Sequence, residues 1–265
     1  MSRRILSEIW IYPIKSLGGI RLQSSQVFEK GLQYDRRWML LNSNSEFMTQ
    51  RAYPKMALFK LSMLQSGFEL KHEADTINLS FEKVTDGRRI QTRVWGDPVE
   101  VLEVPGFHSA WISDRLGVPC KLVAFPEESP RPIDPKYRLA YEHVSLADGY
   151  PLLIIGQSSL DDLNSRMDTP VPMNRFRPNM VFEGGKPYEE DDWKSFMVGK
   201  NRFAAVKPCI RCVLTTVDQE TGDKGREPLL TLSRYRRREE NIYFGENVIP
   251  IDYGEIYEGD EITFQ

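Results

Sequence analysis

Apolar residues occur in this chain only as short runs, and this feature limits the fold more than any other. The longest apolar run covers residues 151–155, which is the length of a single strand. Glycine, asparagine and aspartate interrupt the runs where turns between strands are expected. Strands at short spacing with few helices are typical of barrels and sandwiches. We therefore predict a mainly β fold with a few helices.

The pattern also predicts individual elements. A helix is expected at 107–116, with Gly117 as its stop, and a second helix is expected to begin at Ser158. Strands are expected at residues 5–12, 22–28, 37–42, 57–63, 67–72 and 92–95 in the first half, and at 152–155, 180–182, 202–206, 213–217 and 261–264 in the second.

A proline-rich segment at residues 125–136 separates the two halves. It contains four prolines, each of which fixes φ and removes a backbone donor, so we expect it to be extended and exposed. A length of 265 residues allows one or two domains. The predicted domains are therefore residues 1–125 and 126–265.

Composition excludes several classes of protein. The 13 Phe, 11 Tyr and 5 Trp can fill a sizeable core, so the chain is not disordered. A net charge of -3 argues against a nucleic-acid partner. No apolar run approaches the roughly 18 residues of a membrane helix, and the first residues lack the apolar segment of a signal peptide. With three cysteines and no export signal, we expect a cytoplasmic protein without a membrane partner.

The cysteines divide unevenly. Cys120 stands alone and is expected to be a small buried hydrophobic residue. Cys209 and Cys212 form a C-x-x-C pair, which allows four interpretations: two packed thiols in a hairpin, a zinc site, a redox dithiol, or one thiolate that binds a soft metal. Lys207 and Arg211 flank the pair and would favour the thiolate.

Polar residues in three other places require a binding partner, either within the protein or in a ligand. Lys15 and Ser16 precede two glycines, and they form either an anion-binding turn or an ordinary one. Arg36 and its neighbouring arginine point to opposite faces if extended, so one needs an internal carboxylate or a bound anion. Arg177 and Asn179 belong to a donor-rich row that suits either a polyanion or a solvated edge. The arginines of residues 235–238 precede two glutamates and are expected to form a solvated, self-paired helix end.

Seven motifs, taken together and in order, resemble the MOSC superfamily, in the branch that has an N-terminal MOSC β-barrel domain. Eukaryotic members of this branch are the mitochondrial amidoxime-reducing components, and it has bacterial relatives. The motifs are Y-P-I-K-S at 12–16, D-R-R-W at 35–38, V-W-G-D at 94–97, L-A-D-G-Y-P-L-L-I at 146–154, S-L-D-D-L-N-S-R at 159–166, N-R-F-R-P-N-M-V-F at 174–182 and K-P-C-I-R-C-V-L-T-T-V-D at 207–218. The resemblance implies an N-terminal MOSC β-barrel-like domain followed by a MOSC β-barrel domain.

The resemblance also implies a molybdenum cofactor, molybdopterin, bound between the two domains. Cys212 would be the one protein ligand of the metal and the catalytic residue, with Cys209 as a neighbour. Asn247 stands where some relatives carry a tyrosine, and it can still donate to the phosphate or pterin. The family is also associated with pyridoxal phosphate binding. The implied cofactor-binding residues are Lys15, Ser16, Arg36, Asp148, Gly149, Tyr150, Arg177, Asn179, Ile210, Arg211 and Asn247.

The function implied by the resemblance is the reduction of N-hydroxylated compounds such as amidoximes, hydroxylamines and N-hydroxylated base analogues, a detoxifying reaction. Electrons would come from a separate protein, either a ferredoxin, a flavoprotein or a haem protein. Two alternatives stay open. One is a carrier of molybdenum cofactor or sulfur without turnover, in which Cys212 holds a persulfide, and the other is a structural β-barrel protein without a cofactor.

Overall fold

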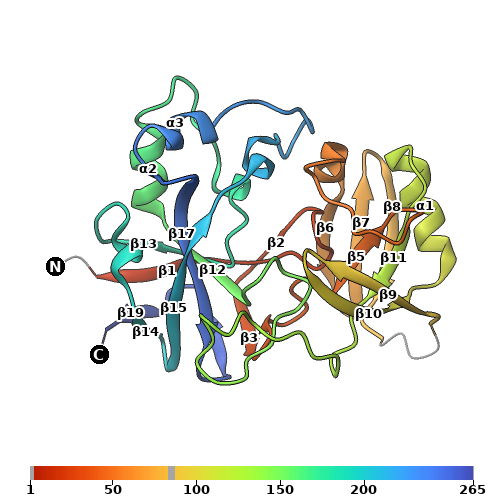
Figure 1. The fold of residues 1–265 in the computed structure, drawn as a ribbon, viewed down its shortest axis with the longest axis horizontal. Coiled ribbons are helices and arrows are strands. Elements are labelled where there is room, and N and C mark those ends of the chain that lie inside the picture. The colour runs from red at the N-terminus through yellow and green to blue at the C-terminus, as the bar shows by residue number, and fades with distance from the viewer. Residues whose placement is uncertain (1–2, 83–86, 265) are drawn as a thin grey trace.

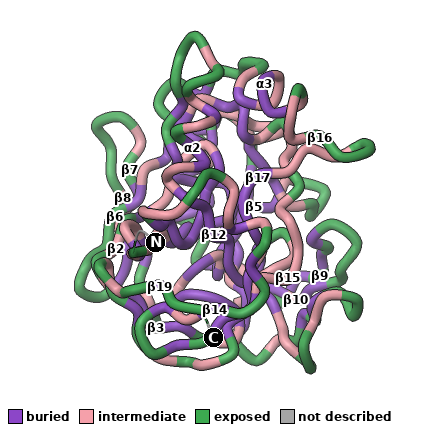
Figure 2. The backbone as a smooth tube through the Cα atoms, turned by 90° about the vertical axis from the view of Figure 1, so that its left-hand side faces the viewer, coloured by how far each residue is buried: buried purple, intermediate pink, exposed green. Residues whose placement is uncertain are grey.

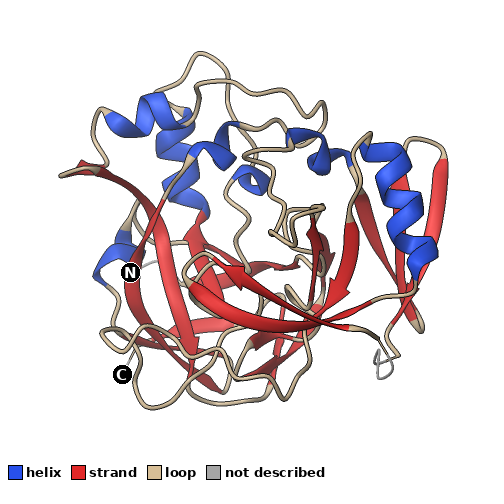
Figure 3. Ribbon diagram, turned by 45° about the vertical axis from the view of Figure 1, so that its right-hand side comes forward, coloured by secondary structure: helices blue, strands red, loops and turns tan. Residues whose placement is uncertain are grey.

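The computed structural model describes residues 3–82 and 87–264. Strands dominate this part of the chain, and its three α-helices are short, so the prediction of a mainly β fold is confirmed (Figure 3). The helices are α1 (Gly106–Leu116), α2 (Gln157–Asn164) and α3 (Leu229–Ser233), with 3-10 helices η1 (Pro54–Leu58), η2 (Met173–Arg175), η3 (Glu189–Asp192) and η4 (Val213–Thr216).

Seven strands close into a barrel, which Figure 1 shows in the left half of the molecule. Their order around the barrel is β12, β13, β1, β19, β14, β15 and β17, and β17 pairs back onto β12. Closure leaves no unpaired edge, and it holds the wall rigid. The strands are β1 (Arg4–Ile11), β12 (Leu152–Gly156), β13 (Met180–Glu183), β14 (Ser195–Val198), β15 (Asn201–Ile210), β17 (Asn241–Pro250) and β19 (Glu261–Thr263); β2 (Ile20–Leu22) pairs with β1, and β16 (Arg237–Arg238) pairs with β17.

Strand β12 shows why these residues form a barrel wall. All five of its residues are buried, because both of its faces are covered. Leu152 and Ile154 point into one apolar cluster with other barrel strands, and Leu153 and Ile155 point into a second cluster that includes residues of α2. Side chains of a strand alternate between its faces, so a continuous apolar run fits a strand that is covered on both sides.

Two smaller sheets lie beside the barrel, on the right of Figure 1, with α1 at their outer side. Helix α1 ends at Gly117, whose φ of 74° is the left-handed conformation that suits glycine. Figure 2 shows buried residues concentrated along the strands, with exposed residues mainly in the connecting loops. The two sheets contain β5 (Trp38–Leu41), β9 (Arg89–Val94), β10 (Asp97–Glu103) and β11 (Lys121–Ala124), and β6 (Lys60–Leu64), β7 (Gly67–His72) and β8 (Asp75–Ser80); a further set joins β3 (Ser24–Phe28), β4 (Gly31–Leu32) and β18 (Glu255–Tyr257).

The first strand and the barrel are connected across the whole sequence. β1 pairs with β13 and β19, so a segment from the start of the chain forms part of a barrel whose other strands lie after residue 150. The boundary at residues 125 and 126 therefore stays a prediction.

Several local predictions are confirmed. Both expected helices are present, as α1 and α2. Most expected strands lie within one or two residues of their predicted positions, and Cys120 is buried, with 7% of its surface exposed.

Other local predictions are wrong. Residues 213–217 form the 3-10 helix η4 instead of a strand. The segment 125–136 is not exposed along its length, because Arg131 and Ile133 are each 1% exposed. The arginines at 235–238 do not form a helix end, because Arg237 and Arg238 form strand β16. They are also only partly self-paired: Arg237 contacts Glu240, whereas Arg236 is paired with Asp191 of η3. Strand β17 was not expected at all.

Candidate functional site

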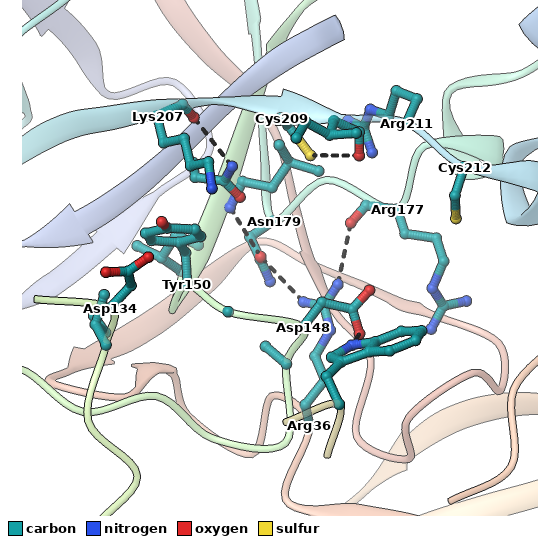
Figure 4. A pocket seen from close by; sticks show the side chains of 18 of the residues that line it. Arg36, Asp134, Asp148, Tyr150, Arg177, Asn179, Lys207, Cys209, Arg211 and Cys212 are labelled. Carbon is teal, nitrogen blue, oxygen red and sulfur yellow. Dashed lines mark hydrogen bonds between the residues drawn. The ribbon is translucent and has the colours of Figure 1, made fainter. Parts of the chain in front are cut away.

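A cavity of about 770 Å³ opens between the barrel and the smaller sheets. Residues from strands, loops and η4 meet in its wall, although they lie far apart in the sequence. Every site residue implied by the sequence lines this one cavity: Lys15, Ser16, Arg36, Asp148, Gly149, Tyr150, Arg177, Asn179, Ile210, Arg211, Cys212 and Asn247. Part of this set is drawn in Figure 4.

Lys15 is a buried cation at the floor of the cavity. Its side chain is 6% exposed, its Nζ donates to the carbonyl of Leu146 at 2.8 Å, and it forms an ion pair with Asp148. Burial lowers the pKa of Lys15, and the Asp148 carboxylate partly opposes that effect. Desolvation acts to raise the pKa of Asp148, but Lys15, with Arg51, outweighs it and holds that pKa well below its usual range. Each partner thus stabilises the charged form of the other.

Two guanidinium groups enclose one tyrosine ring. The Cζ atoms of Arg36 and Arg177 lie 4.3 and 4.2 Å from the ring centroid of Tyr12, within cation–π range. The Arg36 Nη1 donates to Asp35 at 2.6 Å and to Asn179 at 3.1 Å. Arg36 is thus held by an internal carboxylate, one of the two outcomes expected from the sequence.

Arg177 is less completely satisfied. Its Nη1 donates to the carbonyl of Leu17 at 2.7 Å, but its buried Nη2 has no hydrogen-bond partner in the described part of the chain. Burial is the main cause that lowers the pKa of Arg177 to about 10, because a charged group loses hydration there. An anion in the cavity would satisfy the nitrogen and restore the favourable charge.

Arg211 repeats this arrangement from the other side of the cavity. Its Nε donates to the carbonyl of Phe244 at 2.7 Å, and its Nη1 donates to the carbonyl of Phe176 at 3.0 Å. Its Nη2 is also buried without a partner among residues 3–82 and 87–264. Arg175 lines the same cavity, and its buried Nε also lacks a partner in the described part of the chain. Buried donors are almost always hydrogen-bonded in native proteins, so three such guanidinium groups at one cavity favour a ligand that accepts hydrogen bonds.

Backbone strain concentrates at the cavity. Ser16, Arg36, Trp95 and Arg177 adopt positive φ angles of 68°, 51°, 56° and 55°, and all four line it. Residues other than glycine rarely adopt this backbone conformation. The strain persists where surrounding contacts hold the backbone in place. The strained turns aim long polar and aromatic side chains into the shared space.

The two thiols of the C-x-x-C pair differ in their environment. Cys209 closes strand β15, packs partly against an apolar cluster, and burial raises the pKa of its thiol. Cys212 follows the strand and caps η4, where its carbonyl accepts from the Thr215 backbone at 3.1 Å. Figure 4 shows the Cys212 side chain reaching into the space that Arg177 also enters. Both cysteines line the cavity, and the difference between them is that Cys209 also packs against the apolar cluster, where burial disfavours its thiolate.

Amide side chains brace the wall between these charges. Asn247 of β17 donates from Nδ2 to the carbonyl of Lys207 at 3.0 Å (Figure 4). Asn179 donates to the carbonyl of Trp10 at 3.1 Å, and its Oδ1 accepts from Arg36 and from the Leu153 backbone. Their contacts position the basic residues, in addition to any contact with a ligand.

Some residues of the cavity were missed by sequence reasoning. Trp95 and Asp97 belong to the V-W-G-D motif but were not predicted as site residues, and Asp134 carried no signal of its own. Lys207 was expected only to favour the cysteine thiolate, and it also lines the cavity. Asp97 is the ion-pair partner of Arg131 at 2.9 Å. Only the fold reveals these positions, because it brings the β9–β10 turn, the loop at Asp134 and strand β15 to one cavity.

Two kinds of feature, a cluster of metal ligands and a membrane-spanning helix, are absent from the described residues. These residues contain no group of three or more His, Cys, Asp or Glu side chains placed to hold a metal ion. Zinc needs about four ligands, so the zinc interpretation of the C-x-x-C pair gains no support. None of the helices in residues 3–82 and 87–264 has the length and apolarity needed to cross a bilayer.

Comparison with known proteins identifies the family. The MOSC N-terminal beta barrel domain matches residues 3–119, and the MOSC domain matches residues 142–263. The chain belongs to the MOSC superfamily. It is 33% identical to the mouse protein named mitochondrial amidoxime-reducing component 1 over 251 residues, which covers 87% of this chain and 71% of that protein.

Two further relatives extend the comparison. The human mitochondrial amidoxime-reducing component 1 is 32% identical over 289 residues, which covers 97% of this chain and 82% of that protein. A rice protein named molybdenum cofactor sulfurase is 32% identical over 279 residues, but this MOSC chain spans only 34% of its length. The relatives thus include, by name, both amidoxime-reducing components and molybdenum cofactor sulfurases.

Proposed function

We propose that this MOSC protein is a molybdenum-cofactor-dependent oxidoreductase that reduces N-hydroxylated compounds. One observation carries the proposal: three guanidinium groups with unsatisfied nitrogens, those of Arg175, Arg177 and Arg211, line the same cavity as Cys212. The names of the amidoxime-reducing relatives favour this function over others in the superfamily.

The residues present fit the cofactor. A phosphate group would suit the guanidinium groups of Arg177 and Arg211, both of which line the cavity, because planar guanidinium groups match phosphate oxygens. Lys15 would add a third positive charge, and backbone atoms of Ile210 lie close by in the same wall. Asp148, Gly149, Tyr150 and Asn247 line the remaining polar wall, where a pterin needs both donors and acceptors.

Cys212 is the residue that would hold the metal. Thiolate sulfur is a soft ligand, and this cysteine lines the cavity beside basic side chains. When bound, the molybdenum cofactor supplies two-electron oxygen-atom transfer chemistry. The chain itself binds and orients the cofactor, and the strained turns at Ser16, Arg36 and Arg177 preorganise that wall.

The substrate class and partners follow from the same proposal. Amidoximes, hydroxylamines and N-hydroxylated base analogues would be reduced, with electrons from a separate ferredoxin, flavoprotein or haem protein through a small, transient interface. A cytoplasmic, detoxifying role is part of the proposal. Pyridoxal phosphate binding is not part of the proposal.

The two cysteines provide a matched test. Cys212→Ser should lose molybdenum and reduce benzamidoxime at least about 100-fold more slowly than the wild type, with a chemical electron donor, because an essential ligand is lost. Cys209→Ser should retain molybdenum and activity within a few-fold, because its thiol packs against apolar residues. Metal analysis and product chromatography give the two readouts. Full molybdenum-dependent activity in Cys212→Ser would refute the assignment.

The carrier alternative makes a different prediction. If Cys212 carries a persulfide, cyanide treatment should release thiocyanate in proportion to protein, and molybdenum-loaded protein should show no reduction of benzamidoxime. The sulfurase relatives make this comparison worthwhile. A reductase should release no thiocyanate in proportion to protein, and its molybdenum-loaded form should reduce benzamidoxime.

A further inference from the structure

Trp95 presents an aromatic surface to the cavity from outside the barrel. It lies in the turn between β9 and β10, where Val94 pairs with Asp97, and its side chain enters the wall opposite the barrel strands. It is 44% exposed, which is unusual for so large an aromatic residue.

Three contacts hold the indole in place. The Arg51 guanidinium carbon lies 4.0 Å from the ring centroid, and the Phe47 ring meets it edge-on with centroids 5.1 Å apart. The indole Nε1 donates to the Asp148 carboxylate at 3.2 Å. The backbone φ of Trp95 is 56°, so these contacts also maintain a strained conformation. The ring is thus preorganised before any ligand arrives.

These contacts leave part of the ring uncovered. Trp95 lines the cavity and is 44% exposed, although Arg51 and Phe47 pack on it. The Asp148 contact engages only the N–H edge of the indole. A ligand in the cavity can therefore reach ring surface that the protein leaves open.

We propose that Trp95 is a specificity-determining residue that stacks on planar, conjugated N-hydroxylated substrates, such as aryl amidoximes and N-hydroxylated nucleobases, in preference to aliphatic hydroxylamines. This inference rests on the proposed function and deepens it. A flat conjugated group can lie on the indole face, while its amino N–H groups point to the Asp148 carboxylate. An sp³ hydroxylamine offers no matching face, so it gains little from the ring.

Calorimetric titration without any electron donor tests the inference apart from turnover. Benzamidoxime and N-hydroxypiperidine are titrated into the purified molybdenum-loaded wild type, Trp95→Ala and Trp95→Phe. Trp95→Ala should weaken benzamidoxime binding about tenfold, as expected for loss of one stacking contact, and change N-hydroxypiperidine binding less than twofold. Trp95→Phe should keep most of the wild-type preference for benzamidoxime over N-hydroxypiperidine. Phe107→Ala is the matched control, because Phe107 is 61% exposed on α1 and lies outside the cavity lining.

The same proteins are then compared in steady state. Trp95→Ala should raise the KM for benzamidoxime about tenfold with kcat nearly unchanged. Equal weakening of both ligands, or unchanged binding, would overturn the role of Trp95 while leaving the reductase proposal intact. A fall in molybdenum content without a change in preference would also overturn it, since Trp95 would then hold the cofactor. Absence of molybdenum-dependent reduction in the wild type would instead refute the proposed function.

Discussion

Two buried arginines lie at the same cavity, and they have opposite environments. Arg131 lies behind the wall with its side chain fully buried, and its donors reach Asp97 and the backbone carbonyls of Ser145, Ala147 and Asp148. Arg177 lies in the wall itself, and one of its nitrogens has no partner in the described residues.

The difference separates structure from ligand binding. Arg131 ties the loop that carries Asp148 to the β9–β10 turn that carries Asp97, so its charge is used entirely within the protein. Arg177 is buried, but its hydrogen bonds are incomplete. A buried donor without a partner costs free energy of folding unless a bound group accepts its hydrogen bond. The same residue type therefore supports the cavity in one case and is available to a ligand in the other.

The largest expected effect is on stability. Arg131→Met should lower the free energy of unfolding by about 3–5 kcal/mol, because it leaves Asp97 and three carbonyls without their donor. Urea denaturation measures it. Arg89→Met is the control, since Arg89 forms an exposed ion pair with Glu100 and should change stability by less than about 1 kcal/mol. Equal losses of unfolding free energy in Arg131→Met and Arg89→Met would show that Arg131 lacks the structural role that distinguishes it from Arg177.

The second expected effect is on cofactor binding. Arg177→Met should weaken retention of the molybdenum cofactor about 10–100-fold, because a charge-assisted hydrogen bond to an anion is lost. Its free energy of unfolding should fall by no more than about 2 kcal/mol, because loss of the hydrogen bond to Leu17 and of the cation–π contact with Tyr12 is partly offset by removal of an unsatisfied nitrogen. Molybdenum and pterin content, measured beside denaturation curves, check both parts. Unchanged occupancy with a large loss of stability would make Arg177 a structural residue like Arg131.

The smallest expected effect concerns a buried acid that resembles Arg177 in lacking a partner. Glu246 is 3% exposed, and its Oε1 has no hydrogen bond within the described ranges. Burial, and then the carboxylates of Asp191 and Glu190, raise its pKa to about 9 from an ordinary value of 4.5. The folded state therefore keeps a proton that the unfolded chain releases, so this stability is present below about pH 4.5 and is lost as the pH rises through 9.

Glu246→Gln should abolish the loss of stability that Glu246 causes as the pH rises. Its free energy of unfolding should match that of the wild type near pH 5 and exceed it by about 1–3 kcal/mol near pH 9, because a neutral amide replaces a buried carboxylate. Urea curves at pH 5, 7 and 9 measure the difference. Glu240→Gln serves as control, since its side chain is 92% exposed. Parallel pH curves for wild type and Glu246→Gln would contradict the raised pKa.

Local patterns predicted the elements that depend on local properties. The buried strand β12 and helix α1 followed from an apolar run and from helical spacing with a glycine stop. The segment 213–217 alternates like a strand, but its first turn is closed by the Thr215 backbone and side chain, which both donate to the carbonyl of Cys212. Strand β17 was missed because Gly245, Glu246 and Asn247 interrupt its apolar pattern, and pairing with two neighbours stabilises it instead.

The candidate site was predictable where motifs carried it. The motif residues from Lys15 to Asn247 do line one cavity. The environment of each residue was not predictable, because the partners of Arg131 and the contacts of Trp95 come from segments that are remote in sequence.

The amino-acid order alone thus determined strand-scale burial, the mainly β class and a set of residues that proves to line one cavity, because side-chain alternation and motif spacing are local properties. Only the tertiary structure decided which buried charges are satisfied internally and which are left for a ligand. Hydrogen-bond completion depends on carbonyls and carboxylates that long-range strand pairing brings together, and neighbouring residues in the chain do not specify them.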